Sequence, residues 1–346
     1  MMKVAATDNL PAPAAVPAEN SKSLERAAEM LRQAGRLLIL AHASPDGDTI
    51  GSAFALCRAL VLLGKEARVA CSDPFPEKYD YITQHLYDGA GRAAVLPAAD
   101  FEPELVVAVD IAAVKLLGGA MQKWLPQIRL CIDHHPSNER YAALTVLDSQ
   151  AAATCEIIRR AIGLLKVEPD SYIANCIYTG LVTDTGCFRY SNTRPDTLLC
   201  AAEMMRCGAR AAMISKRMFE TYSPRRMEME KLLLESLEYH YEGQVALITV
   251  SRRMCEFTGV DESDLEGVPS ITSRIEGVKI GITLKEKQEG VYKISVRTNS
   301  SADASALCAE FGGGGHRAAA GCQIDGDLMD VRKKILEAAG RTLGKR

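Results

Sequence analysis

The sequence lacks several features that mark common classes of protein. No apolar run reaches the ~18 residues that a membrane-spanning helix needs. The 11 cysteines are odd in number and include no C-x-x-C pair, which favours reduced core thiols over a disulfide framework. The net charge of −3 provides no basic field for wrapping long nucleic acid. We therefore expect a cytoplasmic protein that binds neither a membrane nor long duplex nucleic acid.

The length and composition predict two folded domains. The chain has 346 residues, of which 47% are apolar, so it can bury a sizeable core. Residues 1–20 are rich in alanine and proline without the apolar stretch of a signal peptide, and we expect a disordered leader there. We expect a catalytic domain over residues 21–220, a charged helical connector over 221–242, and a smaller domain over 243–346.

Strands and helices alternate in the first domain. Apolar runs of strand length are found at Leu37–Ala41, Ala67–Cys71, Leu105–Val109, Ile128–Ile132 and Leu144–Leu147. Helical spacing is found at Ser21–Ala34, Asp48–Leu63, Ala151–Ile162, Asp170–Thr183, Pro195–Gly208 and Ala211–Glu220. Such alternation implies right-handed crossovers, and it predicts an α/β fold with a doubly wound, mainly parallel sheet.

The second domain is also predicted to be α/β, but smaller. The charged segment Pro224–Tyr241 is predicted to be the helical connector that precedes it. Strands are expected at Val245–Val250, Lys279–Lys285, Val291–Arg297 and Ala319–Ile324, and helices at Ala304–Phe311 and Leu328–Leu343.

Three short segments place acidic and histidine side chains after apolar runs. They are His42–Asp48, Asp133–His135 and Thr183–Gly186. The run before the third segment, Ile177–Val182, reads as a buried strand, although the wider segment Asp170–Thr183 has helical spacing. Parallel strands deliver their loops to one edge of a sheet, where ligands bind. We therefore expect these side chains to meet.

The acidic and histidine side chains of these three segments suit a centre of two divalent cations. Two such ions about 3.5–4 Å apart can generate a nucleophile and absorb charge in phosphoester hydrolysis. Six residues are expected to ligate them: His42, Asp46, Asp48, Asp110, His134 and Asp184. Asp110, at the end of a strand, is suitably placed to bridge the ions. Four carboxylates against two dications leave the site near neutral, so a phosphate can approach.

Each segment alone has an ordinary structural explanation. Asp46-Gly47-Asp48 could be a turn with Asp48 as a helix cap, and Asp110 could be a turn residue. A His-His pair alone is more often a surface or core pair than a site. The joint occurrence of one ligand type at several strand ends favours the metal site.

The ligand set favours manganese, with magnesium, cobalt or iron as alternatives, because it mixes oxygen with imidazole and contains no thiolate. Asp133 precedes the two histidines and is expected to orient one of them, as partners of metal-bound histidines do. His135 is not among the expected ligands, so we expect it to contact the substrate phosphate or to act as a general acid. We therefore assign Asp110, Asp133 and His135 as catalytic residues.

A glycine run in the second domain is a candidate phosphate site. The segment Gly312–His316 begins with four successive glycines, which have no Cβ. A phosphate can therefore approach their backbone N–H groups closely. Arg297 offers a bidentate fork to the same kind of ligand. The ordinary alternative is a flexible turn. We expect the substrate to be bound by Arg297, Gly313, Gly314, Gly315 and His316.

These motifs together resemble the DHH phosphoesterase family. The resemblance includes His42-Ala-Ser-Pro-Asp-Gly-Asp48, the strand-end Asp110, Asp133-His-His135 and Thr183-Asp-Thr-Gly186. The segment Phe311–Gly321 is similar to the signature of the DHH-associated domain. The resemblance implies that one ion is held by His42 and Asp46, the other by Asp48, His134 and Asp184, with Asp110 between them.

The size and layout are similar to the stand-alone nanoRNase and pAp phosphatase branch of that family. This resemblance implies an enzyme that hydrolyses short oligoribonucleotides to mononucleotides and also acts on 3′-phosphoadenosine 5′-phosphate. The alternative is a phosphodiesterase for pApA or cyclic di-AMP. Less favoured are a family II-like pyrophosphatase and an inactive nucleotide-binding regulator. A homodimer is compatible with the sequence.

Overall fold

The protein is described from a computed structural model that covers residues 18–84, 101–262, 264–265, 267–299 and 301–345. The chain divides into two compact units, Met1–Thr221 and Tyr222–Arg346, and each is described by itself. The expected leader lies outside the described residues except at its last three positions, where helix α1 (Ala18–Gln33) has already begun.

The first unit is built on a parallel sheet of five strands. They are β1 (Arg36–Leu40), β2 (Glu66–Ala70), β3 (Leu105–Val109), β4 (Ile128–Asp133) and β5 (Leu144–Leu147). The strands are hydrogen-bonded in the order β2-β1-β3-β4-β5, and every pair is parallel, as expected. In this order the chain changes direction across the sheet between β1 and β3, which is where open sheets bind ligands.

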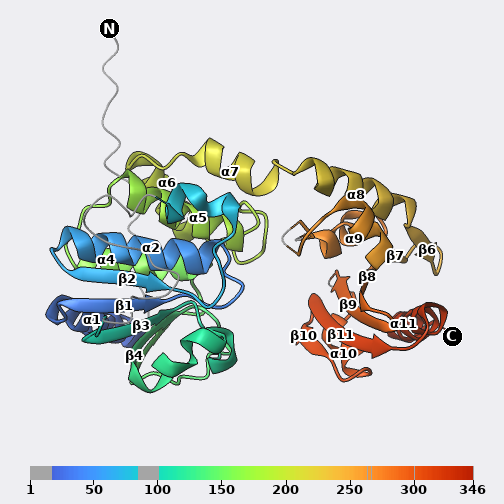
Figure 1. Ribbon diagram of the computed structural model, residues 1–346, viewed down its shortest axis with the longest axis horizontal. Coiled ribbons are helices and arrows are strands. Elements are labelled where there is room, and N and C mark those ends of the chain that lie inside the picture. The colour runs from blue at the N-terminus through green and yellow to red at the C-terminus, as the bar shows by residue number, and fades with distance from the viewer. Residues whose placement is uncertain (1–17, 85–100, 263, 266, 300, 346) are drawn as a thin grey trace, which may run out of the picture. The chain divides into compact units, whose positions relative to one another are not determined.

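Helices cover one face of this sheet, and 3₁₀ turns cover the other. The remaining helices are α2 (Gly47–Leu62), α3 (Asp80–Thr83), α4 (Thr154–Leu164), α5 (Ser171–Asp184), α6 (Pro195–Arg206) and α7 (Ala211–Phe219). Residues of α1, α2, α4 and α5 share one core with the sheet, and Figure 1 shows α2 and α4 over the strands. Residues of Val114–Leu117 and Gly119–Gln127 form the second core on the opposite face.

The prediction of a strand at Ile177–Val182 is wrong, because this run lies within helix α5. The run is apolar on every side because α5 is buried among other helices, and periodicity alone cannot distinguish such a helix from a buried strand. The side chain of Asp170 caps the helix by accepting a hydrogen bond from the Ile173 N–H at 2.9 Å. Asp184 therefore lies at the end of a helix and not at a strand tip.

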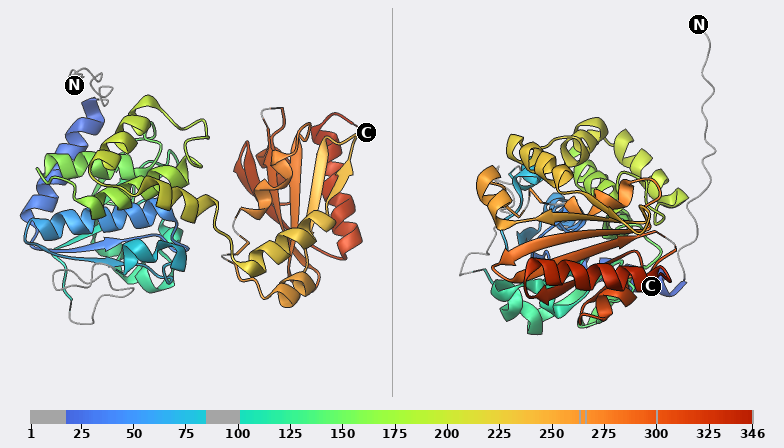
Figure 2. Two further views of the ribbon diagram at one scale, coloured as in Figure 1. Left: turned by 90° about the horizontal axis from the view of Figure 1, so that it is seen from above. Right: turned by 90° about the vertical axis from the view of Figure 1, so that its right-hand side faces the viewer.

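The second unit has a mixed sheet of six strands in the order β10-β11-β9-β8-β7-β6. The strands are β6 (Glu238–His240), β7 (Val245–Val250), β8 (Ile280–Gln288), β9 (Val291–Thr298), β10 (Gly314–His316) and β11 (Ala319–Asp325). Its helices are α8 (Pro224–Glu235), α9 (Arg252–Thr258), α10 (Ala304–Ala309) and α11 (Leu328–Thr342). Figure 2 shows the sheet between α11 and the pair α8 and α9, and each face has its own core.

The helix predicted over Pro224–Tyr241 ends at Glu235, and strand β6 follows. Its charged residues had suggested a solvated connector. The buried side chains of Met229 and Leu233 instead pack into a core of the second unit. The first turn of α8 is also tied to that unit, because Arg225 Nε lies 2.6 Å from an Asp264 oxygen. Most of the expected connector is therefore part of the second unit.

The structure also describes the state of the cysteines and the apolar character of the helices. All 11 cysteines are free, and most of them are buried. Among the described residues, no helix combines the length and the apolar character needed to cross a membrane.

Close packing of α2 on α5 yields a test of the fold. A Cβ at Gly51 would come closer than 3.0 Å to the backbone oxygen of Cys176. We expect Gly51→Ala to lower the free energy of unfolding by about 1–3 kcal/mol, because backbone atoms cannot move aside easily. Gly163→Ala in α4 is the control, since a Cβ there meets only the end of the Arg159 side chain at 3.0 Å. Because alanine favours helices, the control should gain up to about 1 kcal/mol. Denaturant unfolding measures both, and equal effects would contradict the close-packing argument.

Candidate metal centre

The structure brings all six expected metal ligands to the carboxyl edge of the first sheet. His42 follows β1, Asp110 follows β3 and His134 follows β4. Asp46 and Asp48 come from the start of α2, and Asp184 is the last residue of α5. Three sets of ligand atoms lie within 4.8 Å of one another: His42, Asp46 and Asp110; Asp48, His134 and Asp184; and Asp110, His134 and His135.

In the first set, the imidazole of His42 faces two carboxylates. Its Nδ1 lies 2.8 Å from the Ala43 carbonyl oxygen, so this nitrogen carries the proton in the neutral ring. Its Nε2 lies 3.6 Å from an oxygen of Asp46 and 3.6 Å from Oδ2 of Asp110. Nε2 of His42 and one oxygen of each carboxylate therefore lie within 4.8 Å of one another, as ligands of one cation would.

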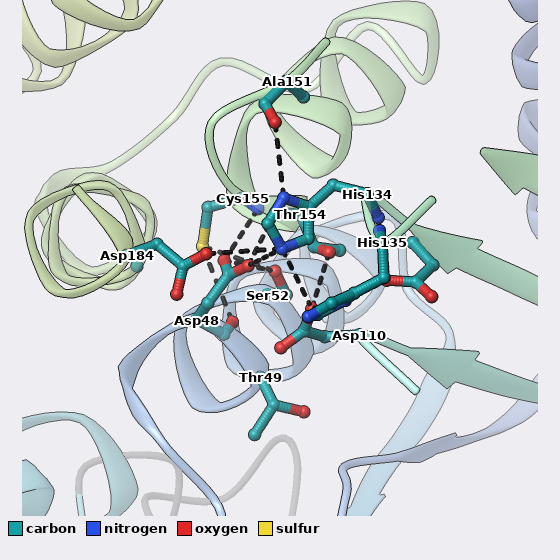
Figure 3. Close-up of polar contacts among 12 residues, drawn as sticks. Asp48, Thr49, Ser52, Asp110, His134, His135, Ala151, Thr154, Cys155 and Asp184 are labelled. Carbon is teal, nitrogen blue, oxygen red and sulfur yellow. Dashed lines mark hydrogen bonds and ion pairs between the residues drawn. The ribbon is translucent and has the colours of Figure 1, made fainter. Parts of the chain in front are cut away.

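In the second set, His134 is arranged in the same way. Its Nε2 lies 3.3 Å from Asp184 Oδ2, 3.9 Å from Asp48 Oδ2 and 3.8 Å from Asp110 Oδ1. This nitrogen is buried, and it has no hydrogen-bond partner among the residues that the structure describes. Buried polar atoms rarely remain unpaired. A divalent cation would satisfy this nitrogen and the carboxylates together, so the residues fit a metal centre (Figure 3).

Asp110 connects the two sets. Its Oδ2 is the oxygen near His42, whereas its Oδ1 is the oxygen near His134. The residue has a φ of +60°, in the left-handed region that aspartate tolerates better than most side chains do. Each oxygen of this one carboxylate therefore faces a different group of ligands, as a bridging role requires.

The turn after β1 corrects one expectation. The side chain that caps α2 is that of Asp46, which accepts hydrogen bonds from the N–H groups of Asp48 and Thr49 at 3.0 and 3.1 Å. The carboxylate of Asp48, which had seemed suited to this role, instead accepts hydrogen bonds from the start of α4. Neither bonding pattern could be read from residue types, because both aspartates suit a helix start.

Burial and mutual repulsion dominate the electrostatics. Burial, together with the carboxylates of Asp110 and Asp46, raises the pKa of Asp48 well above its usual range. Burial and the neighbouring carboxylates, that of Asp48 first, do the same to the pKa of Asp184. Burial alone would lower the pKa of His42, but hydrogen bonds to Asp110 and Asp46 raise it to about 11. The centre therefore has a strong affinity for positive charge.

Asp133 orients His135. Its buried Oδ1 accepts a hydrogen bond from His135 Nδ1 at 2.8 Å and others from the N–H groups of His134 and His135. The hydrogen bond that His135 donates to Asp133 raises the pKa of His135 to about 9. Asn138, which sequence reasoning missed, donates a hydrogen bond to the other oxygen of Asp133 at 2.6 Å. The side chain of His135 is 42% exposed, so its second nitrogen is accessible to a ligand.

The expected substrate-binding residues all lie in the second unit. His316 in β10 and Arg297 in β9 both pair with Ala319 of β11. Directly paired residues of antiparallel strands point to the same face, so both side chains stand on one face with only a methyl group between them. His316 is exposed and Arg297 is half-buried. This row can present a guanidinium and an imidazole to one anion.

The glycine run has structural as well as functional reasons for its composition. A Cβ at Gly313 or at Gly315 would come closer than 3.0 Å to backbone atoms of β11, and Gly315 has a φ of +148°. A Cβ at Gly314 would meet nothing within 4 Å. Gly313 and Gly315 are therefore needed by the hairpin itself. Gly314 is the position at which the absence of a side chain leaves open space beside the backbone.

Sequence reasoning also missed the start of α4. The N-cap position of this helix is Ala153, which provides no capping side chain. Thr154 and Cys155, the next two residues, contact the carboxylates of the metal centre (Figure 3). The sequence contains no signal for these contacts, because Thr154 itself suits an N-cap and only the structure places Ala153 at that position.

With this geometry in hand, comparison with known proteins assigns the chain to a family. A model of the DHH family, N-terminal domain, matches residues 36–181, and a model of the DHHA1 domain matches residues 244–345. The chain belongs to the DHH family, as the motifs had indicated.

Its relatives include proteins of similar length. The bifunctional oligoribonuclease and PAP phosphatase NrnA of Thermus thermophilus is 33% identical over 325 residues, which cover 91% of this chain and 93% of the relative. The structure of an exopolyphosphatase-related protein from Bacteroides fragilis matches with a TM-score of 0.84 and 25% identity, over 93% of this chain and 96% of that one. The fold is also shared with RecJ of T. thermophilus in complex with Mn²⁺, at a TM-score of 0.54 and 18% identity, over 96% of this chain and 56% of that one.

The charge of the centre predicts how stability depends on pH and metal. The raised pKa values of Asp48 and Asp184 mean that their contribution to stability is fully present below an unfolded-state pKa of 3.8 and is lost as pH rises. Metal-free protein should therefore lose stability on going from pH 5.5 to 7.5. Mn²⁺ at 100 times its dissociation constant should raise Tm by roughly 5–10 °C at pH 7.5, and by less at pH 5.5, where protons compete.

Thermal unfolding with Mn²⁺ or with a chelator measures this effect. Asp48→Asn should stabilise the metal-free protein at pH 7.5 and should reduce the gain from Mn²⁺. The matched control is Asp325→Asn, which removes an exposed carboxylate of the second unit. An unchanged gain from Mn²⁺ in Asp48→Asn would show that this carboxylate does not contact the cation.

Proposed function

We propose that this protein is a metal-dependent hydrolase that degrades short oligoribonucleotides to mononucleotides and also removes a phosphate from 3′-phosphoadenosine 5′-phosphate. The single observation that carries the proposal is Asp110, whose two oxygens face two separate groups of histidine and carboxylate ligands. The relative from T. thermophilus, which matches over nearly its whole length, bears both activities in its name.

In this proposal, His42 and Asp46 would hold one cation, and Asp48, His134 and Asp184 would hold the other. Asp110, whose two oxygens face the two groups, would contribute to both. When bound, a pair of divalent cations supplies a nucleophile at neutral pH and stabilises charge on the phosphoryl oxygens. Manganese suits the mixed oxygen and imidazole donors, with magnesium, cobalt or iron as alternatives. The six side chains would hold these cations, and the four carboxylates among them would keep the loaded site near electrical neutrality.

His135 acts on the substrate itself. Its Nδ1 is held by the buried carboxylate of Asp133, and this leaves Nε2 to face a ligand. The hydrogen bond to Asp133 raises the pKa of the ring, which favours its protonated form. It can therefore donate a hydrogen bond to a phosphoryl oxygen and a proton to the leaving oxygen. Asn138 acts through Asp133 by fixing its orientation.

The second unit binds the substrate. Arg297 and His316 provide a guanidinium and an imidazole on one face of its sheet, and the backbone at Gly314 has no side chain beside it. Charge-assisted hydrogen bonds of this kind are worth about 1.5–3 kcal/mol each. Together they suit the phosphate of a short nucleotide. We place the protein in the cytoplasm, in keeping with its free cysteines.

The principal test is substrate length. With Mn²⁺, we expect purified protein to release mononucleotides from labelled di- to pentaribonucleotides and phosphate from 3′-phosphoadenosine 5′-phosphate, and to leave long RNA largely intact. Asp110→Ala should reduce the turnover at least about 100-fold while leaving the unfolding transition in chelator cooperative. Undiminished turnover in this variant would remove the bridging role, and equal cleavage of long RNA would exclude the proposed substrate class.

The same assay separates the rival substrates. If pApA or cyclic di-AMP were hydrolysed with a much higher kcat/KM than dinucleotides of other bases, the protein would be a phosphodiesterase for adenine dinucleotides. If every nucleotide were left intact and only pyrophosphate were hydrolysed, the nucleotide assignment itself would fail.

Single substitutions in the second unit test the assigned substrate contacts. We expect His316→Ala to raise KM for dinucleotides about 10-fold or more with little change in kcat, because it removes binding shared by the ground and transition states. Gly314→Ala should also raise KM while leaving Tm unchanged, since its Cβ enters open space. Gly119→Ala is the control, because a Cβ there also meets nothing within 4 Å, but in the first unit.

Steady-state kinetics and thermal unfolding distinguish the outcomes. Unaltered kinetics in Gly314→Ala would mean that phosphate does not approach the backbone at this position. A loss of kcat without a change of KM in His316→Ala would place this histidine in the chemical step.

A further inference from the structure

Helix α4 begins without a capping side chain of its own, and the metal centre provides the missing cap. The helix starts after Ala153, whose methyl group cannot accept a hydrogen bond. The free N–H groups of Thr154 and Cys155 donate instead to Oδ2 and Oδ1 of Asp48, at 2.6 and 2.9 Å. The first turn of a helix favours a negative charge and leaves N–H groups unsatisfied. Asp48 is therefore held by α4 as well as by its own helix.

The side chain of the first residue in α4 holds a second carboxylate. Thr154 Oγ1 donates a hydrogen bond to Asp110 Oδ1 at 2.9 Å, and Thr154 is fully buried. Asp48 and Asp110 come from different elements, the start of α2 and the end of β3. Figure 3 shows Thr154 beside both carboxylates, with one hydrogen bond to each. A single residue thus contacts two side chains that carry like charges.

We propose that Thr154 is a positioning residue for the metal centre: it fixes the carboxylate of Asp110 relative to that of Asp48 and thereby sets the affinity for the pair of divalent cations. This inference rests on the proposed function, because it assumes that these carboxylates ligate metal. It adds a role for the start of α4, which belongs to none of the segments from which the ligands were predicted.

The hydroxyl group performs this role by limiting rotation of the bridging carboxylate. Oδ1 of Asp110 has two lone pairs, and Thr154 occupies one of them, which leaves the other for a cation. Oδ2 then remains directed toward His42, at 3.6 Å. Without the hydroxyl, the carboxylate could rotate and lose its alignment with one of the two groups of ligands. Outer partners of metal ligands commonly contribute 10- to 100-fold in metal affinity or activity.

The two contacts made by Thr154 can be separated experimentally. Thr154→Val keeps the shape of the side chain and the backbone N–H that bonds to Asp48, and it removes only the hydroxyl. Thr154→Ser retains the hydroxyl and loses a methyl group. The matched control is Thr283→Val, because Thr283 is also buried and its hydroxyl has no partner among the described residues.

Mn²⁺ alone is the probe. Calorimetric titration of the metal-free protein should show two Mn²⁺ ions per chain, with at least one bound about 10- to 100-fold more weakly in Thr154→Val. The electron paramagnetic resonance signal of two coupled Mn²⁺ ions should be weakened or altered in this variant at equal loading. With Mn²⁺ at saturation, kcat for dinucleotides should fall while KM changes little. Thr154→Ser and Thr283→Val should resemble the unaltered protein.

The outcomes distinguish this inference from the function on which it rests. If the unaltered protein binds no Mn²⁺, the metal centre itself is refuted. If it binds two ions, and Thr154→Val binds them with unchanged affinity, coupling and kcat, the positioning role is refuted while the metal centre stands. If Thr154→Val does not fold in chelator, Thr154→Ala replaces it. If Thr154→Ser loses as much affinity as Thr154→Val, the effect comes from packing, and the inference is equally overturned.

Discussion

The concentration of negative charge at the end of the first sheet is the constraint on which this unit depends. Four carboxylates converge with two imidazole nitrogens in a largely buried volume. Like charges in such a place cannot all stay ionised unless cations or protons compensate them. Asp184 is the last residue of α5, and the C-terminal end of a helix disfavours a negative charge, so its ionised form carries an added electrostatic cost. The fold must therefore hold these groups against their own repulsion.

Hydrogen bonds from the N-terminal ends of helices offset the repulsion between these carboxylates. Asp46 caps α2, and Asp48 accepts hydrogen bonds from the first turn of α4, so two helix N-termini face two of the carboxylates. These partners leave the outer lone pairs of the oxygens available to a cation. Asp110 is held by its strand end, in a left-handed backbone conformation, and by Thr154. The same contacts that stabilise the helices thus arrange the ligands.

The role proposed for the second unit is a different one, that of presenting hydrogen-bond donors to an anion. Its sheet brings His316 and Arg297 onto one face by pairing both with Ala319. The hairpin of β10 and β11 is close enough to require glycine at positions 313 and 315. The glycine run is therefore partly explained by packing, and Gly314 is the position at which the proposed phosphate contact has open space.

Much of the architecture follows from sequence patterns. Alternating apolar runs predicted the five parallel strands, and turns rich in aspartate and histidine predicted the ligands at their ends. Both depend on local periodicity and on the shared edge of a parallel sheet. The same reasoning failed at Ile177–Val182, since a helix buried on all sides has no polar face to reveal its period. For Pro224–Tyr241 it found the helix but placed its end too late, and the charged residues obscured the buried side chains of Met229 and Leu233.

The sequence by itself determined which chemistry is available, because the residue types and their spacing suffice to name the six candidate ligands. Only the tertiary structure decided how those ligands are held. It showed that Asp46 rather than Asp48 caps α2, that Asp133 bonds to His135, and that Thr154 reaches Asp110. These partners are far apart in the chain or chemically interchangeable at short range. Hydrogen bonds depend on direction and distance, and these are set only when separate elements pack together.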